Sequence, residues 1–373
     1  MQILTPVSHT LQSPPPPVRR GFVLKLGWRP SIMLQNDNRQ RKTSGGIDFK
    51  WHGLPATRTT LPLLDASQAI PAFTRRPFQI GSSVPPATVN PYYEVIVRLP
   101  TDEDPTEVPV GLVSRNYQLI QHHEILQRAA SVLASYGVDL TKVTVNLDLT
   151  VHGERMTLGL VFPKDSEYTY AVGRDDVMAL YLEFINSVDG SLRLAFRVSW
   201  LRLVCTNGLM LREVLSDFSR MHIGVEVLKE FEDHLPSALE SVVDHKRLFA
   251  RWMGLKIAEA TFQEWTENTV RKTWGLKAAV RAHHITLRGV DVEIDKMIRG
   301  VPVRDMPIRD KGLVPGSIPG SLNLFAVSQA LTWLAGDRGE IQEQLDWKSQ
   351  VFPMVTALLP RHDQASLFGA RQE

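Results

Sequence analysis

The middle of the chain alternates between apolar and polar residues, a pattern typical of β-strands that bury one face. Two of these strands, Leu192 onward and the run before it, flank Asp189-Gly190, which favours a tight hairpin turn because glycine accepts the positive φ that the turn requires. The pattern therefore predicts an antiparallel sheet. Its strands are expected at residues 92–99, 107–114, 143–151, 156–162, 177–185 and 192–204.

The apolar spacing changes to a helical period in two parts of the chain. Residues 122–137 carry apolar side chains at helical spacing and end at Gly137. From residue 225 onward the helical period dominates, with a Gly/Pro loop over residues 312–320 and further helices at 322–334 and 340–359. This order predicts an α+β protein, with an antiparallel sheet, one packed helix and a mostly helical C-terminal half.

Residues 1–88 contain frequent Pro, Ser, Thr and Asn without sustained periodicity, so we expect a disordered arm. Residues 1–60 hold nine Lys/Arg and two Asp/Glu, although the net charge of the whole chain is only +2. A basic arm is typical of nucleic-acid binders, but we slightly favour the alternative of an unstructured leader from a start codon assigned too far upstream. The predicted divisions are the arm at 1–88, a sheet core at 89–223, a helical region at 224–360 and a flexible tail at 361–373.

The composition excludes several classes of protein. A single cysteine excludes an internal disulfide and a multi-cysteine zinc site. The chain has no apolar run of membrane-spanning length and no signal peptide, so we expect a cytoplasmic protein without a membrane partner. Nucleotide-binding loops and the zinc motif H-E-x-x-H are absent, so we expect no cofactor and no metal. Asp175-Asp176 could hold Mg²⁺ if other acids converged, but a turn before the next strand is the interpretation we favour.

The strand that begins at Leu192 has two chemically different faces. Arg193 and Arg197 share one face with small residues, about 7 Å apart at ordinary strand rise. That face could follow phosphate groups. The alternative, which we favour here, is a solvated face whose arginines pair with acids such as Glu183.

Cys205 follows this strand and precedes Thr206-Asn207-Gly208. A nucleophilic cysteine needs a lowered pKa and a nearby base, and nothing in the sequence brings a histidine to it. We therefore expect Cys205 to fill space beside a backbone bend made by Asn207 and Gly208.

Three short motifs resemble those of an uncharacterised family of phage, plasmid and prophage proteins, known as a domain of unknown function. They are Arg115 with Tyr117, the hairpin Asp189-Gly190-Ser191, and the block Arg202, Cys205 and Asn207. The resemblance covers roughly residues 90–340 and implies an origin in a mobile element, without an established activity. The order strand, strand, helix, sheet is more loosely similar to the single-strand annealing proteins of phage recombination, which is an analogy of fold alone.

Residues 244–288 combine nine Lys/Arg with three tryptophans, Trp252, Trp265 and Trp274. Basic residues interleaved with aromatic rings suit a groove for single-stranded nucleic acid. The alternative, which we favour, is a helical bundle with buried Trp and exposed cations. The residues expected to contact DNA are Arg193, Arg197, Arg202, Lys246, Arg247, Arg251, Arg271 and Lys272.

The tail contains Gln364-Ala365-Ser366-Leu367-Phe368, which resembles the pentapeptide with which bacterial replication and repair proteins bind the sliding clamp. In that motif Gln364, Leu367 and Phe368 would be the contact residues, with the two large apolar side chains filling a pocket. Ala365 stands where a second leucine is common. The alternative is a terminal helix that packs Leu367 and Phe368 into the body, which Pro360 opposes.

The sequence thus predicts a non-catalytic protein of DNA recombination, replication or repair that binds single-stranded or forked DNA. We expect it to form a homo-oligomer and to be tethered to the clamp by its tail. A protein-binding inhibitor of a host nuclease or defence factor is the first alternative, and a Mg²⁺-dependent nuclease that uses Asp175 or Asp176 is the second.

Overall fold

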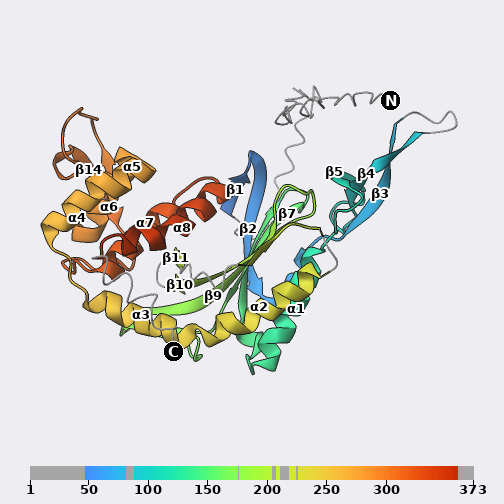
Figure 1. Cartoon of the computed structure of the whole chain (residues 1–373), viewed down its shortest axis with the longest axis horizontal. Coiled ribbons are helices and arrows are strands. Elements are labelled where there is room, and N and C mark those ends of the chain that lie inside the picture. The colour runs from blue at the N-terminus through green and yellow to red at the C-terminus, as the bar shows by residue number, and fades with distance from the viewer. Residues whose placement is uncertain are drawn as a thin grey trace, which may run out of the picture. The chain divides into compact units, whose positions relative to one another are not determined.

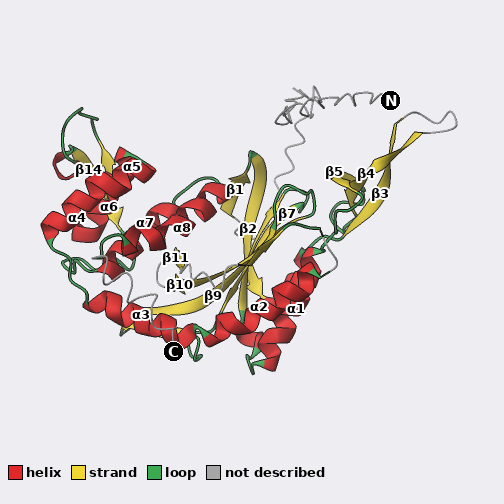
Figure 2. Cartoon of the chain, viewed as in Figure 1, coloured by secondary structure: helices red, strands yellow, loops and turns green. Residues whose placement is uncertain are grey.

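The computed structural model describes residues 47–80, 88–174, 176–203, 207–210, 218–223 and 226–359. Its strands form a nine-stranded antiparallel sheet, a separate three-stranded sheet and a two-stranded hairpin, and most of its helices follow the strands in the chain (Figures 1 and 2). The predicted α+β class is confirmed. None of the described helices has the length and apolar character needed to span a bilayer.

The main sheet has the strand order β1-β2-β6-β7-β9-β10-β11, with β8 paired to β9 and β12 paired to β10. The hairpin β9–β10 forms around Asp189-Gly190 as predicted, and Gly190 has the expected positive φ of 77°. The strands are β1 (Ile47–Trp51), β2 (Leu54–Pro62), β6 (Thr144–Thr150), β7 (Arg155–Val161), β8 (Thr169–Gly173), β9 (Asp176–Ser187), β10 (Leu194–Arg202), β11 (Asn207–Met210) and β12 (Phe218–Arg220).

The central part of one face of this sheet is apolar. A row of Leu147, Leu158, Phe184 and Phe196 crosses four neighbouring strands, and all four side chains are buried. Helices α1 (His122–Ser135), α2 (Val227–Glu240) and α3 (Val242–Gly254) cover it. Phe231 of α2, for example, lies edge-on to Phe184 and Phe196. Burial of this face is the main stabilising contribution to the fold.

The smaller sheet consists of β3 (Phe73–Ile80), β4 (Thr88–Arg98) and β5 (Val108–Ser114). From here on we call this sheet the arm; it is a different feature from the disordered arm predicted for residues 1–88. One face of the arm packs against the β9–β10 turn, where Ile96 and Val113 contact Val188. Gly111 permits this approach, because an added Cβ would lie 2.6 Å from Cα of Asp189.

The C-terminal helices share a continuous hydrophobic core with the main sheet. The predicted boundary near residue 223 therefore does not separate two cores. The remaining elements are α4 (Glu259–Trp265), a π-helix (Thr266–Val270), α5 (Arg271–Trp274), α6 (Leu276–Arg288), β13 (Val290–Ile294), β14 (Ile308–Leu313), α7 (Leu324–Gly336) and α8 (Ile341–Thr356), with 3-10 turns at Leu63–Ala69, Leu140–Lys142 and Val303–Asp305.

Order begins earlier than we predicted. We expected coil up to residue 88, but β1, β2 and β3 lie within residues 47–80. Strand β2 buries little of its own apolar surface and is held by pairing with β6, about ninety residues away, so no local pattern identifies it. The hairpin β13–β14 was also missed, because a bulge between Asp291 and Val292 interrupts its alternation.

Candidate functional site

The second face of the main sheet is polar across five strands, which is unusual for a sheet covered on both sides. Its central row runs Asn146, Gly159, Glu183 and Arg197, from β6 to β10. Helix α8 crosses this face. We call the following side chains the polar layer: Arg58, Asn146, Asp148, Thr157, Tyr181, Glu183, Arg197 and, from α8, Lys348.

Arg58 and Asp148 form a bidentate ion pair at one side of the polar layer. Nε and Nη2 of Arg58 donate to the two carboxylate oxygens of Asp148 at 2.6 and 2.7 Å, and the hydroxyl of Thr157 donates to the same carboxylate at 2.6 Å. Burial alone would lower the pKa of Arg58, but the hydrogen bonds and charge of Asp148 outweigh it and raise the pKa. The charge of Asp148 is thus matched locally.

Tyr181 lies across β7 in the space that Gly159 leaves open. A Cβ added to Gly159 would lie 1.8 Å from the hydroxyl oxygen of Tyr181. Burial, followed by the charge of Glu183, raises the pKa of Tyr181, so its hydroxyl stays protonated at neutral pH. Glycine at position 159 therefore determines the shape of the polar layer.

Glu183, Arg197 and Lys348 form the other side of the polar layer. Glu183 is only 4% exposed and lies opposite Arg197 in the strand register, yet Nη1 of Arg197 is buried and has no hydrogen-bond partner in the described part of the chain. Burial lowers the pKa of the half-buried Lys348. The carboxylates of Glu183 and Asp148 oppose that shift, and the guanidinium groups of Arg58 and Arg197 add to it.

This arrangement has an excess of positive charge. Arg58 is matched by Asp148, whereas Glu183 alone faces both Arg197 and Lys348. An unsatisfied buried donor costs roughly 1–3 kcal/mol. A bound anion would accept from Arg197 and oppose the lowering of the pKa of Lys348. On the β2 side the face is open, since Thr60 is exposed and Arg58 is partly exposed.

The three arginines that we predicted to contact DNA from this part of the sheet have different surroundings in the structure. Arg193 is exposed and directly precedes β10, whereas Arg197 belongs to the polar layer. Arg202, by contrast, is 2% exposed, pairs with Asp176 and donates to the carbonyl of Gly316. Arg202 is therefore a structural residue, and the prediction that it contacts DNA does not fit its burial.

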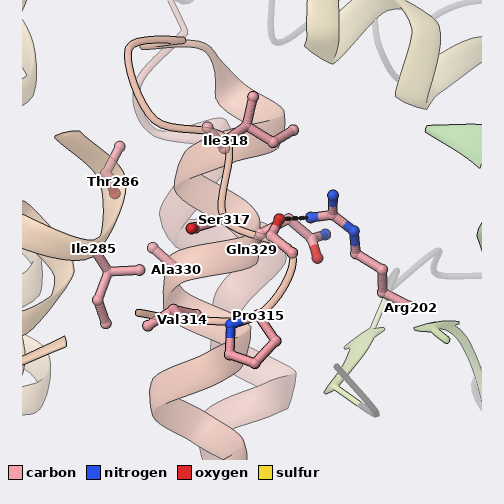
Figure 3. Close-up of a pocket in the computed structure, with 11 residues that line it drawn as sticks. Arg202, Ile285, Thr286, Val314, Pro315, Ser317, Ile318, Gln329 and Ala330 are labelled. Atoms are coloured by element: carbon pink, nitrogen blue, oxygen red, sulfur yellow. Dashed lines mark hydrogen bonds between the residues drawn. The ribbon is translucent and has the colours of Figure 1, made fainter. Parts of the chain in front are cut away.

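Figure 3 shows Arg202 beside a small cavity between α7 and the loop before it. The cavity measures about 10 Å³, roughly the space of one water molecule. Thr286 and Gln329 each present a buried polar atom without a hydrogen-bond partner there. The cavity is too small for a substrate.

The predicted cations of α3 and α5 lie away from the polar layer. Lys246 donates to the carbonyl of Glu167, and Arg247 is 77% exposed and pairs with Asp244. Together with the half-buried Arg251, they belong to α3, which covers the apolar face.

In the π-helix and α5, Arg271 pairs with Glu267 and Lys272 is exposed. The tryptophans at 252, 265 and 274 are all buried. The helical bundle with buried Trp is thus the correct interpretation of this region, and its rings are not available to stack on bases.

The remaining predicted residues have different outcomes. Asp189 accepts hydrogen bonds from Ser191 and pairs with Arg155, so it fixes the β9–β10 turn. Asn207 and Gly208 lie within β11 and not in the bend that we expected, because Gly208 pairs with Leu201. Asp175, Cys205, Gln364, Leu367 and Phe368 lie outside the described residues.

The described residues contain no group of three or more His, Cys, Asp or Glu that could hold a metal ion. Asp176 is engaged by Arg202. A second, larger hollow lies beside the π-helix, but Gln263, Glu267 and Arg304 in its wall already bond to protein groups. The polar layer therefore remains the best candidate for a functional site.

Sequence reasoning identified two members of the polar layer, Arg197 and the acid expected to face it, Glu183. Asn146 with Asp148, and Tyr181 with Glu183, are polar residues at alternate positions of apolar strands, a signal that could have been read. Arg58 and Lys348 could not have been found in this way, because they are 290 residues apart and meet only through the fold.

A model of the family described as Domain of unknown function (DUF932) matches residues 109–288. The match runs from β5 to α6 and contains six of the eight members of the polar layer, all except Arg58 and Lys348. No curated protein and no solved structure shows a significant match. Over just under half of its length, the chain is thus similar to an uncharacterised family, in agreement with the resemblance noted in its sequence.

Proposed function

We propose that this protein binds single-stranded DNA and that the polar layer, together with Arg193, contacts the phosphates. The observation that carries the proposal is Nη1 of Arg197, a buried donor without a partner in the described residues, next to Lys348. A phosphate oxygen would satisfy the donor and match the excess positive charge.

The protein would act without chemistry of its own, in recombination, replication or repair. We further propose that it originates from a mobile element, in line with the sequence motifs around Arg115, Tyr117 and Asp189. The exposed basic residues of α3 then contribute to solubility, and the polar layer contacts the phosphates of the DNA strand.

Fluorescence anisotropy with labelled single- and double-stranded oligonucleotides across a salt series tests this proposal. We expect tighter binding of single strands, with log K falling by about 0.7 per contacted phosphate for each unit of log salt concentration. Absence of binding at low salt would contradict the proposal and bring the alternative of a protein-binding inhibitor forward. Mg²⁺-dependent cleavage that is lost in Asp176→Ala would support the nuclease instead.

We also propose that the tail tethers the protein to the replication sliding clamp. The support is the motif at Gln364, Leu367 and Phe368 together with Pro360, which disfavours a continued helix. A weak tail contact and a weak DNA contact reinforce each other through effective concentration.

The combined substitution Leu367→Ala/Phe368→Ala should abolish retention of the protein on immobilised clamp. Its affinity for oligonucleotides should stay at the wild-type value, because the polar layer is untouched. Ser366→Ala serves as the control, since that position is variable in the motif. Retention of the double variant at the wild-type level would show that the tail does not bind the clamp.

A further inference from the structure

Exposed apolar side chains are concentrated in two places on this protein. The described part of the chain has thirteen large apolar side chains that are exposed, and seven of them lie either on the arm or on the β13–β14 hairpin. Exposed apolar clusters of this kind mark interaction surfaces. The two surfaces are carried by elements at opposite ends of Figure 1.

The arm surface is the outer face of the three-stranded sheet. Val95 pairs with Leu112 and Tyr93 pairs with Ser114, so Tyr93 and Leu112 are neighbours on this face. Tyr92 next to them is 73% exposed. Asn90 accepts hydrogen bonds from the backbone of both tyrosines, which fixes an irregular turn of the strand that presents both rings outward.

Acidic residues border the arm surface. The loop between β4 and β5 contains exposed Asp102, Glu103 and Glu107. Glu107 pairs with Arg76, which lies in the same row as Val95 and Leu112, so the acidic loop adjoins the apolar face. The arm surface is therefore apolar with a negative margin.

The hairpin surface has the opposite charge. The loop between β13 and β14 exposes Met297 and Ile298 between Lys296 and Arg299, and these four residues make up the hairpin surface. Leu313 is 80% exposed at the opposite end of the hairpin, where it pairs with Val290. No described residue forms an ion pair with Lys296 or Arg299. This surface is therefore apolar with a positive margin.

We propose that the arm surface of one copy of this chain docks on the hairpin surface of a second copy. Each surface offers exposed apolar groups, and their charged margins are complementary. Because the two surfaces are different and lie far apart on one molecule, the contact is head-to-tail. Such contacts generate closed rings when the rotation closes, and open filaments when it does not.

Two charge-reversal variants of the full chain test the contact. The arm variant is Asp102→Lys/Glu103→Lys, and the hairpin variant is Lys296→Glu/Arg299→Glu. Lys229→Glu/Lys272→Glu makes the same change in net charge as the hairpin variant, at exposed lysines elsewhere, and is its matched control. Molar mass is measured by light scattering after gel filtration, and circular dichroism confirms that each variant is folded.

We expect the wild type and the control to exceed the monomer mass of 42.0 kDa, and each charge-reversal variant to run as a monomer. An equimolar mixture of the arm and hairpin variants should associate again, because reversed acids then meet reversed bases. Combining all four substitutions in one chain should restore association too. A monomeric wild type at every concentration, or variants that stay monomeric when mixed, would overturn the proposal.

Discussion

Single residues account for the unusual polarity of the second sheet face. Gly159 leaves the space in which Tyr181 lies, and Tyr181 is close enough to Glu183, Arg58 and Asp148 for their charges to shift its pKa. The close approach of ring and backbone is possible only without a side chain at position 159. The geometry of the polar layer therefore depends on a residue that carries no charge.

Gly159→Ala should lower the free energy of unfolding by about 1–3 kcal/mol, because the methyl group overlaps the ring of Tyr181 and overpacked cores carry such a cost. Urea unfolding at pH 7 measures the change. Gly254→Ala is the matched control, since no atom lies within 4 Å of a Cβ added there. An equal midpoint for both variants would show that Tyr181 moves aside freely.

Two buried histidines make the fold sensitive to acid. Burial lowers the pKa of His122 to about 4, although a hydrogen bond with the carbonyl of Gly153 opposes the shift. Burial likewise lowers the pKa of His222 to about 4, although a hydrogen bond with the backbone of Gln118 and the charge of Asp189 oppose it. Both rings are neutral in the folded protein and take up a proton near pH 6.5 when unfolded. Their stabilisation is complete above pH 6.5 and is lost as the pH falls towards 4.

The free energy of unfolding should therefore fall between pH 7 and pH 5, by roughly 2 kcal/mol for each histidine. His222 stacks on Tyr117 with ring centroids 5.0 Å apart, so His222→Phe preserves the ring packing. This variant should lose the contribution of His222, about 2 kcal/mol, from the pH dependence in urea titrations at the two pH values. A wild-type pH slope in His222→Phe would assign the effect to other groups.

At the scale of elements, local signals were sufficient where the structure depends on local contacts. Helix α1 ends at Ser135, two residues before Gly137, and the β9–β10 hairpin turns at Asp189-Gly190, both as predicted. Strands β1 and β2 have no comparable local signal. Trp51 and Ala56 are buried only because Ile341 and Leu345 of α8 cover them, from the other end of the chain. The candidate site was missed for the same reason, since its charges come from strands and a helix far apart in sequence.

Removal of β1 and β2 should therefore destabilise the whole sheet. A chain that starts at residue 64 lacks Arg58, the ion-pair partner of the buried Asp148, and also lacks β2, the strand that pairs with β6. We expect the free energy of unfolding to fall by at least about 3 kcal/mol, the cost of breaking a buried ion pair. A chain that starts at residue 45 retains both strands and is the control in thermal and urea unfolding. Equal stability of the two chains would show that the order in β1 and β2 is dispensable.

At the scale of the whole molecule, the two sheet faces have separate roles. The apolar face, covered by α1 to α3, stabilises the fold, and the polar face beneath α8 carries the charges proposed to bind DNA. The arm and the β13–β14 hairpin contain no member of the polar layer, so the proposed head-to-tail association would not compete with the proposed phosphate contacts. The polar layers of neighbouring copies would then contact successive segments of one DNA strand.

The central claim is that the polar layer, and not the basic surface of α3, contacts the DNA strand. The most direct measurement compares the affinity of Arg197→Ala and Arg247→Ala for a labelled single-stranded oligonucleotide across a salt series. We predict that Arg197→Ala weakens binding and reduces the salt slope by about 0.7, the contribution of one phosphate contact, while Arg247→Ala matches the wild type. Normal binding by Arg197→Ala, with a loss in Arg247→Ala, would contradict the account and place the DNA on the helical side of the sheet.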